Sequence, residues 1–281
     1  MRWKNTSMCR WLAYLGNPIY LEELIYKPKH SLIDQSLAAR TSETTTNGDG
    51  FGVGWYGNRV TPGVYRNIQP AWNDNNLKDL AAQIASPLFL AHVRAATSTA
   101  VQQTNCHPFR YDKWLFVHNG VIDNFKHIKR DLALAIAPDL YPFIEGSTDS
   151  EIMFYLALTF GLADDPVNAL EMMVGFIEQV SQDNGGTTSI QMTLGISEGK
   201  RLIAVRYSTI GQSRTLYCSK NWRACQELNP ECDIFSENAR LVVSEPLTDL
   251  TDDWEEVPES TAIIIQSDHT VTQSFQPRSF Q

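Results

Sequence analysis

The sequence has no run of about eighteen or more apolar residues, the length that a membrane-spanning helix requires. Its first seven residues, MRWKNTS, carry positive charge without an apolar segment, so no secretory signal is expected. Excess positive charge is also missing, because the formal net charge is −9, and this disfavours nonspecific attraction to nucleic acid or anionic lipid. We therefore expect a cytoplasmic protein that binds neither membranes nor nucleic acid.

Cysteine is sparse and odd in number, which in the absence of a secretory signal predicts reduced thiols rather than a disulfide framework. The five cysteines are Cys9, Cys106, Cys218, Cys225 and Cys232. The last three recur every seventh residue, a spacing too wide for the paired CxxC ligands of a zinc site. They are expected to be packing residues.

Low-complexity tracts and internal repeats are absent as well, and 281 residues with 43% hydrophobic side chains can form one domain with a sizeable core. Helical patterns occur between residues 18 and 40, from 77 to 84 behind a cap at Asn75 or Asn76, after Asn124, and from Asp149 and Asp165 onward. Strand patterns occur at 88–97 and 115–120. Six more, at 189–196, 202–207, 215–218, 241–244, 262–266 and 271–275, suggest an antiparallel meander. We expect two packed sheets with helices outside.

Cys9 lies at the start of an apolar, strand-like run, WLAYL. A cysteine at a free amino terminus would hold both a nucleophilic thiol and, in its α-amine, a base of pKa about 7.7–8.0. Eight residues, Met1 to Met8, precede Cys9 and convert this amine to an amide, which is no base. The chemistry therefore requires removal of an extension, residues 1–8, or a translation start at Met8, and leaves residues 9–281 as the domain.

Residues 47–56, NGDGFGVGWY, alternate glycine at positions 48, 50, 52 and 54 with larger side chains. On a strand, every glycine then lies on one face, where another backbone or a ligand can approach closely. The pattern GxGxxG is not matched, because Trp55 occupies the position of its third glycine. Close packing near a site is predicted rather than nucleotide binding.

Residues 88–97, LFLAHVRAAT, form a pattern typical of a buried strand with Leu90, His92, Arg94 and Ala96 on one face. An arginine at the end of so apolar a strand needs an anion. Two interpretations stay open: an internal salt bridge, or a planar fork that binds a substrate carboxylate through two parallel hydrogen bonds.

The strand pattern at 115–120 ends in Asn119-Gly120, a dipeptide usually found in tight turns. The functional alternative is an oxyanion hole, in which the Asn119 amide and a backbone N–H at Gly120 converge on one oxygen.

Thr148 and Glu151 have the spacing of a capping box before an apolar helical run. Asp149 falls in the first helical turn, where the helix dipole favours an ionised carboxylate. It either only supports the helix terminus or is a fixed anion for a substrate ammonium. With Arg94, it would complement a substrate end that bears one carboxylate and one ammonium.

Together these motifs resemble those of the class II glutamine amidotransferases, which are N-terminal-nucleophile (Ntn) hydrolases, and especially the small stand-alone members similar to the γ-glutamyl hydrolase of ergothioneine synthesis. The resemblance covers nearly all of residues 8–281 and rests on segments 8–16 (MCRWLAYLG), 48–56 (GDGFGVGWY), 92–97 (HVRAAT), 105–109 (NCHPF), 118–120 (HNG), 147–149 (STD) and 244–247 (SEPL). It implies an α+β fold: a four-layer αββα sandwich of two mainly antiparallel sheets, with the nucleophile at the start of a central strand.

By this resemblance, Cys9 attacks the side-chain amide of L-glutamine or another γ-glutamyl amide, and Asn119 with the Gly120 N–H stabilises the oxyanion. Arg94 and Thr97 would hold the α-carboxylate, and Asp149 the α-ammonium. Water then releases glutamate from the thioester, with no cofactor or metal ion. The histidines at 92, 107 and 118 are expected to be structural, and Arg10 receives no role.

The resemblance leaves three functions open. Many family members have tryptophan at the position of Ala95, and in lacking it this chain is similar to the stand-alone branch. We also find no ammonia-accepting domain in the sequence. Hydrolysis of a γ-glutamyl amide is therefore the leading hypothesis. The alternatives are a glutaminase subunit that passes ammonia to a partner protein, and a catalytically silent γ-glutamyl-binding protein in which residues 1–8 stay attached.

Overall fold

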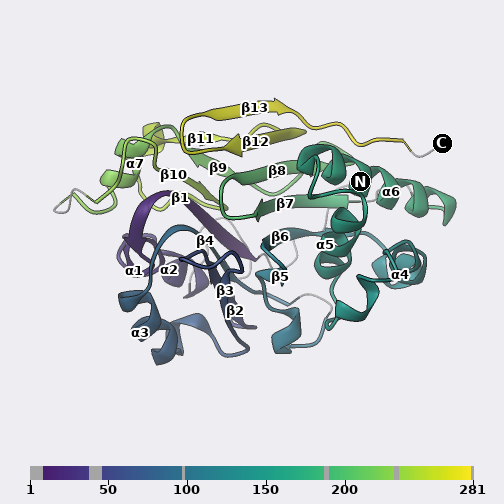
Figure 1. Ribbon diagram of the computed structural model, residues 1–281, viewed down its shortest axis with the longest axis horizontal. Helices are drawn as coiled ribbons and strands as arrows, with labels where there is room; N and C mark the ends of the chain where they lie inside the picture. The colour runs from purple at the N-terminus through teal and green to yellow at the C-terminus, as the bar shows by residue number, and fades with distance from the viewer. Residues whose placement is uncertain (1–8, 38–45, 97–98, 187–189, 231–233, 280–281) are drawn as a thin grey trace.

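The computed structural model describes residues 9–37, 46–96, 99–186, 190–230 and 234–279. Its strands form two sheets that pack face to face, and helices cover the outer face of each (Figure 1). The predicted α+β, four-layer αββα arrangement is therefore confirmed. None of the helices in these ranges is both long and apolar enough to cross a membrane.

The first sheet has seven strands among the described residues, in the order β11-β9-β10-β1-β4-β2-β3, and each pairs antiparallel with its neighbours. These strands are β1 (Arg10–Tyr20), β2 (Phe51–Trp55), β3 (Gly63–Asn67), β4 (Ala85–Val93), β9 (Tyr217–Ser219), β10 (Arg240–Val243) and β11 (Trp254–Glu256). Its outer face packs against α1 (Glu22–Ile25), α2 (Leu32–Leu37), α3 (Asn75–Gln83) and α7 (Trp222–Gln226).

Strand β1 is central because both of its faces carry apolar side chains. Successive side chains of a strand point to opposite faces. Trp11, Ala13 and Leu15 accordingly pack in the layer between the sheets, whereas Leu12 and Tyr14 pack under the helices. The strand is thus fixed between two apolar layers as well as between β4 and β10.

The second sheet has six strands within the described ranges, in the order β13-β12-β8-β7-β6-β5. They are β5 (Phe109–Tyr111), β6 (Trp114–Ile122), β7 (Ile190–Ser197), β8 (Leu202–Ser208), β12 (Thr261–Ile265) and β13 (Thr270–Ser274). Helices α4 (Phe125–Leu134), α5 (Asp149–Thr159) and α6 (Pro166–Asp183) cover its outer face.

Two predictions of local structure are wrong. The strands after residue 189 do not form one meander, because β7, β8, β12 and β13 belong to the second sheet and β9, β10 and β11 to the first. An alternating pattern identifies a strand but not its partner, which nonlocal packing decides. Helix α3 is capped by Asp74, whose carboxylate accepts a 2.7 Å hydrogen bond from the Leu77 N–H, and not by Asn75 or Asn76.

The glycine-rich stretch packs closely, as predicted. A Cβ added to Gly52 of β2 would collide with the carbonyl oxygen of His107, and one on Gly54 would lie 2.8 Å from the Leu115 side chain. Because the glycine face of β2 carries no side chains, strand β6 and the loop before β5 pack closely against it.

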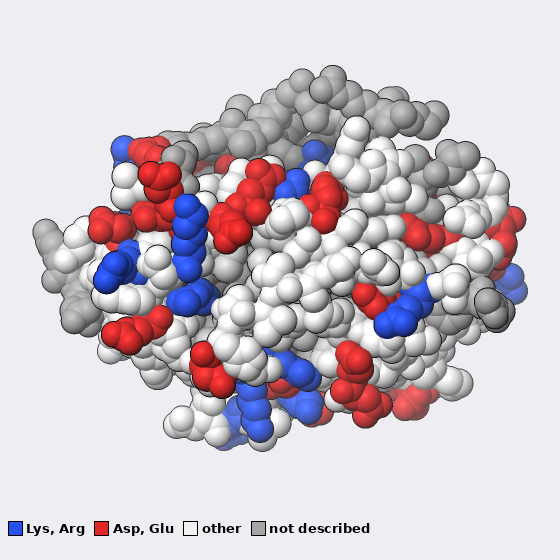
Figure 2. All heavy atoms as spheres, turned by 90° about the horizontal axis from the view of Figure 1, so that it is seen from above, with Lys and Arg blue, Asp and Glu red and all other residues white. Residues whose placement is uncertain are grey.

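Charges of both signs are interspersed over the face drawn in Figure 2, with broad uncharged areas between them.

Candidate active site

Cys9 directly precedes β1, at the point where this strand enters the sheet between β4 and β10. The residue is half-buried. Its Sγ accepts a hydrogen bond from the Ala95 N–H at 3.4 Å and lies 3.6 Å from the Ala95 carbonyl oxygen. The thiol thus lies against the segment that follows β4, at the start of a central strand.

The charged side chains of Arg94, Arg10 and Asp149 lie close enough to Cys9 to act on its thiol. Burial raises the pKa of the thiol above its ordinary value; the Ala95 N–H, Arg94 and Arg10 lower this pKa in part, and Asp149 raises it. Because the net effect is upward, the thiol keeps its proton near neutral pH. Thiolate chemistry at Cys9 therefore needs a base.

Arg94 is a buried cation, only 3% exposed. Its guanidinium donates to the Asp49 carbonyl oxygen at 3.2 Å, the Thr99 hydroxyl at 2.6 Å and the Ala100 carbonyl oxygen at 3.2 Å. No carboxylate within the described ranges forms an ion pair with it. The internal salt bridge considered from the sequence is therefore not found among the described residues. The positive charge of Arg94 has neutral hydrogen-bond partners instead.

Arg10, which the sequence left without a role, belongs to a buried ion pair. Its Nε donates to Glu245 Oε1 at 2.7 Å, and its side chain also donates to the Cys9 carbonyl oxygen at 3.0 Å. Ser244, the neighbour of Glu245, accepts from the Trp11 N–H and donates its own N–H to the Trp11 carbonyl oxygen, each at 3.0 Å. The segment SEPL therefore holds the backbone around Cys9.

Trp11 connects this backbone to the opposite sheet. Its indole N–H donates to the Thr193 hydroxyl on β7 at 3.1 Å, and that hydroxyl donates to the Asn119 carbonyl oxygen on β6 at 3.4 Å. The adjacent Gly120 has no room for a side chain, because a Cβ there would collide with the Gln191 carbonyl oxygen and approach His118. Asn119 and Gly120 thus lie within β6 rather than in a tight turn.

Asp149 occupies the first turn of α5, as predicted, and Thr148 caps this helix by accepting from the Glu151 N–H at 3.2 Å. The reciprocal half of the capping box is not formed, since Glu151 instead accepts from the N–H groups of Glu145 and Gly146. The Asp149 carboxylate accepts from the Ile122 N–H at 2.9 Å and the Ser150 N–H at 2.8 Å. Its orientation is therefore fixed.

Three histidines are buried behind this arrangement. The rings of His92 and His107 lie 4.2 Å apart between centroids, and His118 Nδ1 lies 2.7 Å from the Ser150 hydroxyl. Burial is the main cause that lowers the pKa of all three, to about 3 for His92 and well below the ordinary value for His107. All three are therefore neutral near pH 7, and within the described ranges none hydrogen-bonds to Cys9.

Arg214 is a further cation that the sequence gave no reason to single out. It follows β8 in the chain. Burial is the main cause that lowers the pKa of its guanidinium, the charge of Arg10 lowers this pKa further, and the charge of Cys9 raises it. Like the pair of Arg10 and Glu245, the charges of Arg214, Arg10 and Cys9 come from distant parts of the chain.

Some predicted residues lie outside the part of the chain that the structure describes: Thr97, residues 1–8 and Cys232. Among the described cysteines, Cys9, Cys106, Cys218 and Cys225 are free thiols. Over the same ranges, no three His, Cys, Asp or Glu side chains are grouped so that they could hold a metal ion.

Two packed antiparallel sheets between helical layers are the arrangement of the Ntn-hydrolase class of fold. The glutamine phosphoribosylpyrophosphate amidotransferase of Bacillus subtilis superposes with a TM-score of 0.66, over 96% of this chain and 50% of that one, at 15% identity, a likeness of fold alone. The sequence also matches the family model of the class-II glutamine amidotransferases over residues 27–281. The chain therefore belongs to this family of Ntn-type amidotransferase and hydrolase enzymes, as its motifs predicted.

Individual relatives support this assignment. The probable glutamine amidotransferase DUG3 of Saccharomyces cerevisiae is 33% identical over 92% of this chain and 82% of its own length. A γ-glutamyl-hercynylcysteine sulfoxide hydrolase of Mycolicibacterium smegmatis is 28% identical over 71% of this chain and 79% of its own. A glutamine aminotransferase class-II domain protein from Silicibacter pomeroyi, 32% identical, superposes with a TM-score of 0.75 over 96% of this chain and all of that one.

Proposed function

We propose that this protein hydrolyses a γ-glutamyl amide, either glutamine or a larger γ-glutamyl compound, through a thioester on Cys9. The observation that carries the proposal is the position of the Cys9 thiol, at the start of a central strand and within electrostatic reach of Arg94, Arg10 and Asp149. The relative from M. smegmatis is by name a hydrolase of a γ-glutamyl compound, which supports this substrate class.

Arg94 and Asp149 are proposed to hold the two charged groups of the glutamyl end. A buried cation without a carboxylate partner is costly, so a bound α-carboxylate would compensate the charge of Arg94. Thr97 follows Arg94 closely in sequence and is proposed to share that carboxylate. The Asp149 carboxylate, held by two backbone N–H groups, would attract the α-ammonium.

The proposed reaction needs the α-amine of Cys9 and therefore the absence of residues 1–8. This amine accepts the thiol proton, which the thiol would otherwise retain because burial raises its pKa. The thiolate attacks the γ-carbonyl carbon, and the Asn119 amide with the Gly120 N–H stabilises the oxyanion. The protonated α-amine returns the proton to the departing ammonia or amine. Water, deprotonated by the same α-amine, then cleaves the thioester and releases glutamate.

The test compares two chains, one starting at Met1 and one at Cys9, in assays of glutamate and ammonia release from L-glutamine and of glutamate release from a panel of γ-glutamyl amides. We expect turnover only by the chain that starts at Cys9, loss of turnover in Cys9→Ala, and retention in Cys218→Ala, which removes a buried thiol of β9. Equal activity of both chains would refute the requirement for a free amine. Inactivity of both towards every compound would favour a γ-glutamyl-binding protein.

A second function is favoured by the name of the yeast relative, a probable glutamine amidotransferase. In that case the released ammonia would pass to an acceptor on a partner protein. Ammonia release from glutamine that rises only when a copurifying partner is added would support this function over simple hydrolysis.

A further inference from the structure

A cavity lies at the end of the sheets opposite to Cys9. It is lined by residues 56–60 after β2, by Lys113 just before β6 and Trp114 at the start of β6, by residues 198–201 between β7 and β8, and by Ala163. Its volume is about 530 Å³, which is typical of small-molecule sites. On β6, Trp114 is five residues from Asn119, or about 16 Å along the strand, so this cavity is separate from the candidate active site.

The floor of the cavity is held in place by Tyr56. This buried side chain donates through its hydroxyl to the Ser197 carbonyl oxygen at 2.7 Å and approaches the Lys113 carbonyl oxygen at 2.9 Å. Gly199 has a positive φ of 95°, and a Cβ there would lie 2.7 Å from the Tyr56 ring. The turns β5–β6 and β7–β8 are therefore both fixed against the ring of Tyr56, and the cavity is preformed.

The charge of the lining opposes the charge of the whole protein. Four cations, Arg59, Lys113, Lys200 and Arg201, line it together with one carboxylate, Glu198, although the net charge of the chain is −9. The acidic residues Asp112 and Asp164, which adjoin the lining in sequence, do not contribute to it.

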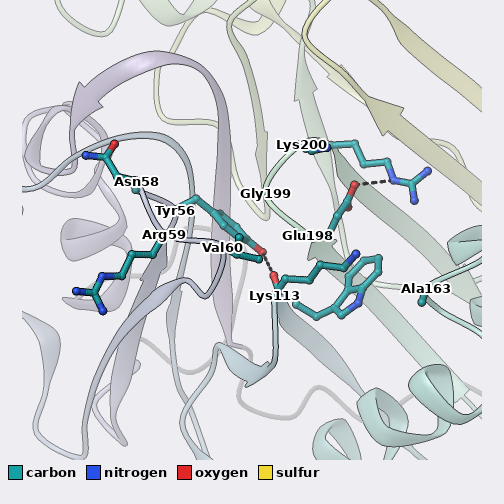
Figure 3. Close-up of a pocket in the computed structure, with 12 residues that line it drawn as sticks. Tyr56, Asn58, Arg59, Val60, Lys113, Ala163, Glu198, Gly199 and Lys200 are labelled. Carbon is teal, nitrogen blue, oxygen red and sulfur yellow. Dashed lines mark hydrogen bonds and ion pairs between the residues drawn. The ribbon is translucent and has the colours of Figure 1, made fainter.

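Among these four cations, Arg201 forms an ion pair. Arg201 Nε lies 3.0 Å from Glu198 Oε1, and Figure 3 shows this contact together with the Lys113 side chain, which extends toward the same side of the pocket. The Lys113 ammonium lies 5.9 Å from the centroid of the Trp114 ring. Within the described ranges, no carboxylate forms an ion pair with Lys113, Lys200 or Arg59. In Figure 3, Arg59 extends away from Glu198, on the opposite side of Tyr56.

We propose that this cavity binds a small polyanion, a metabolite with two or more phosphate or carboxylate groups, at a site separate from Cys9. Within the described ranges Lys113 and Lys200 form no ion pair with a carboxylate, although the charge of Lys113 also acts on Glu198. Arg201 adds a planar group of donors. A hollow that is preformed and carries several cations favours a compact multivalent anion over a single charge.

The experiment is isothermal titration calorimetry of the full chain at low ionic strength, with pyrophosphate and citrate as separate probes. We expect saturable binding at one site per chain, weakened by added salt. The variant Lys113→Gln/Lys200→Gln should weaken this binding about tenfold or more, since each screened charge contributes on the order of 1 kcal/mol. The matched control Lys78→Gln/Lys126→Gln, which removes two exposed charges from α3 and α4, should bind like the unmodified chain.

The stronger probe identifies the anion: pyrophosphate for a phosphorylated ligand, citrate for a polycarboxylate. Failure of both probes to saturate, or equal weakening by the two double variants, would overturn the proposal. If the cavity variant is less stable than the control by circular dichroism, Arg201→Gln provides a second test with the same expected direction. None of these readouts depends on turnover, so the result is independent of the proposed chemistry at Cys9.

Discussion

Acidification should destabilise this fold through two buried imidazoles. Burial lowers the pKa of His92 to about 3 and that of His107 well below its ordinary value. In the unfolded chain, both side chains should titrate near pH 6.5. As the pH falls below about 6.5, the unfolded state binds protons that the folded state excludes, so the free energy of unfolding decreases with falling pH.

The size of the effect follows from these pKa values. At pH 5, protonation stabilises the unfolded state by about 2 kcal/mol for each histidine whose folded pKa lies near 3. His92 alone should therefore remove about 2 kcal/mol between pH 7.5 and 5. His107, whose pKa is also lowered by burial, should add to this loss in the same direction. The loss is a substantial part of the roughly 5–15 kcal/mol that stabilises a typical domain. His118 acts in the same direction, because burial lowers its pKa, while the charge of Asp149 opposes that shift.

The assay is urea unfolding at pH 7.5 and pH 5, with the difference in unfolding free energy as the readout. The variant His92→Gln carries no titrating group at this position, so the pH-dependent loss should shrink by about 2 kcal/mol, whatever the substitution costs at either pH. His127→Gln, which changes an exposed residue of α4, should leave the loss unchanged. A loss below about 1 kcal/mol in the unmodified chain, or an equal loss in His92→Gln, would refute the reasoning.

Three further predictions concern packing, the ion pair and a helix cap. Gly120→Ala should destabilise the fold by about 1–3 kcal/mol or more in urea unfolding, because its Cβ would collide with the backbone of β7. The control Gly57→Ala should be close to neutral, because a Cβ there meets no atom within 4 Å. Equal costs of the two substitutions would contradict the packing argument. Arg10→Met should lower the free energy of unfolding by about 3–5 kcal/mol, because it removes the cation that pairs with the buried Glu245 carboxylate. The double variant Arg10→Met/Glu245→Leu should recover part of this loss in the same assay. No recovery would argue against the ion pair as the cause. Thr148→Ala should lower stability by about 1 kcal/mol through loss of the hydrogen bond to the Glu151 N–H, while Thr148→Ser should keep it, and thermal unfolding distinguishes the two.

Elements with a strong local pattern were predicted correctly from the sequence. The short apolar runs after Cys9 and before Arg94 form strands, and the apolar run behind the cap at Thr148 forms a helix, as predicted. The two-sheet architecture followed because the strand patterns lie on both sides of the helical segments. The close approach at Gly52 and Gly54 also followed, since a strand face without side chains admits a neighbouring backbone.

The contacts that surround the thiol could not be predicted in this way, because they join residues far apart in the chain. Arg10 and Glu245 are separated by 235 positions, and Trp11 and Thr193 by 182. A single sequence contains the motif SEPL and the residue Arg10, but nothing in their spacing says that they meet. The division of the last strands between two sheets was missed for the same reason.

Cys9 and Asn119 are carried by different sheets, and the Trp11 indole crosses the layer between them. The separation between sulfur and amide is therefore governed by the thickness of that interior layer rather than by any loop near the thiol. If Cys9 acts as proposed, substitutions that thicken or thin this layer, at Leu90 or Val117 for example, would change the distance over which its thiol must reach the substrate. Some variants that change the interior volume should therefore change turnover while their melting temperature stays nearly the same.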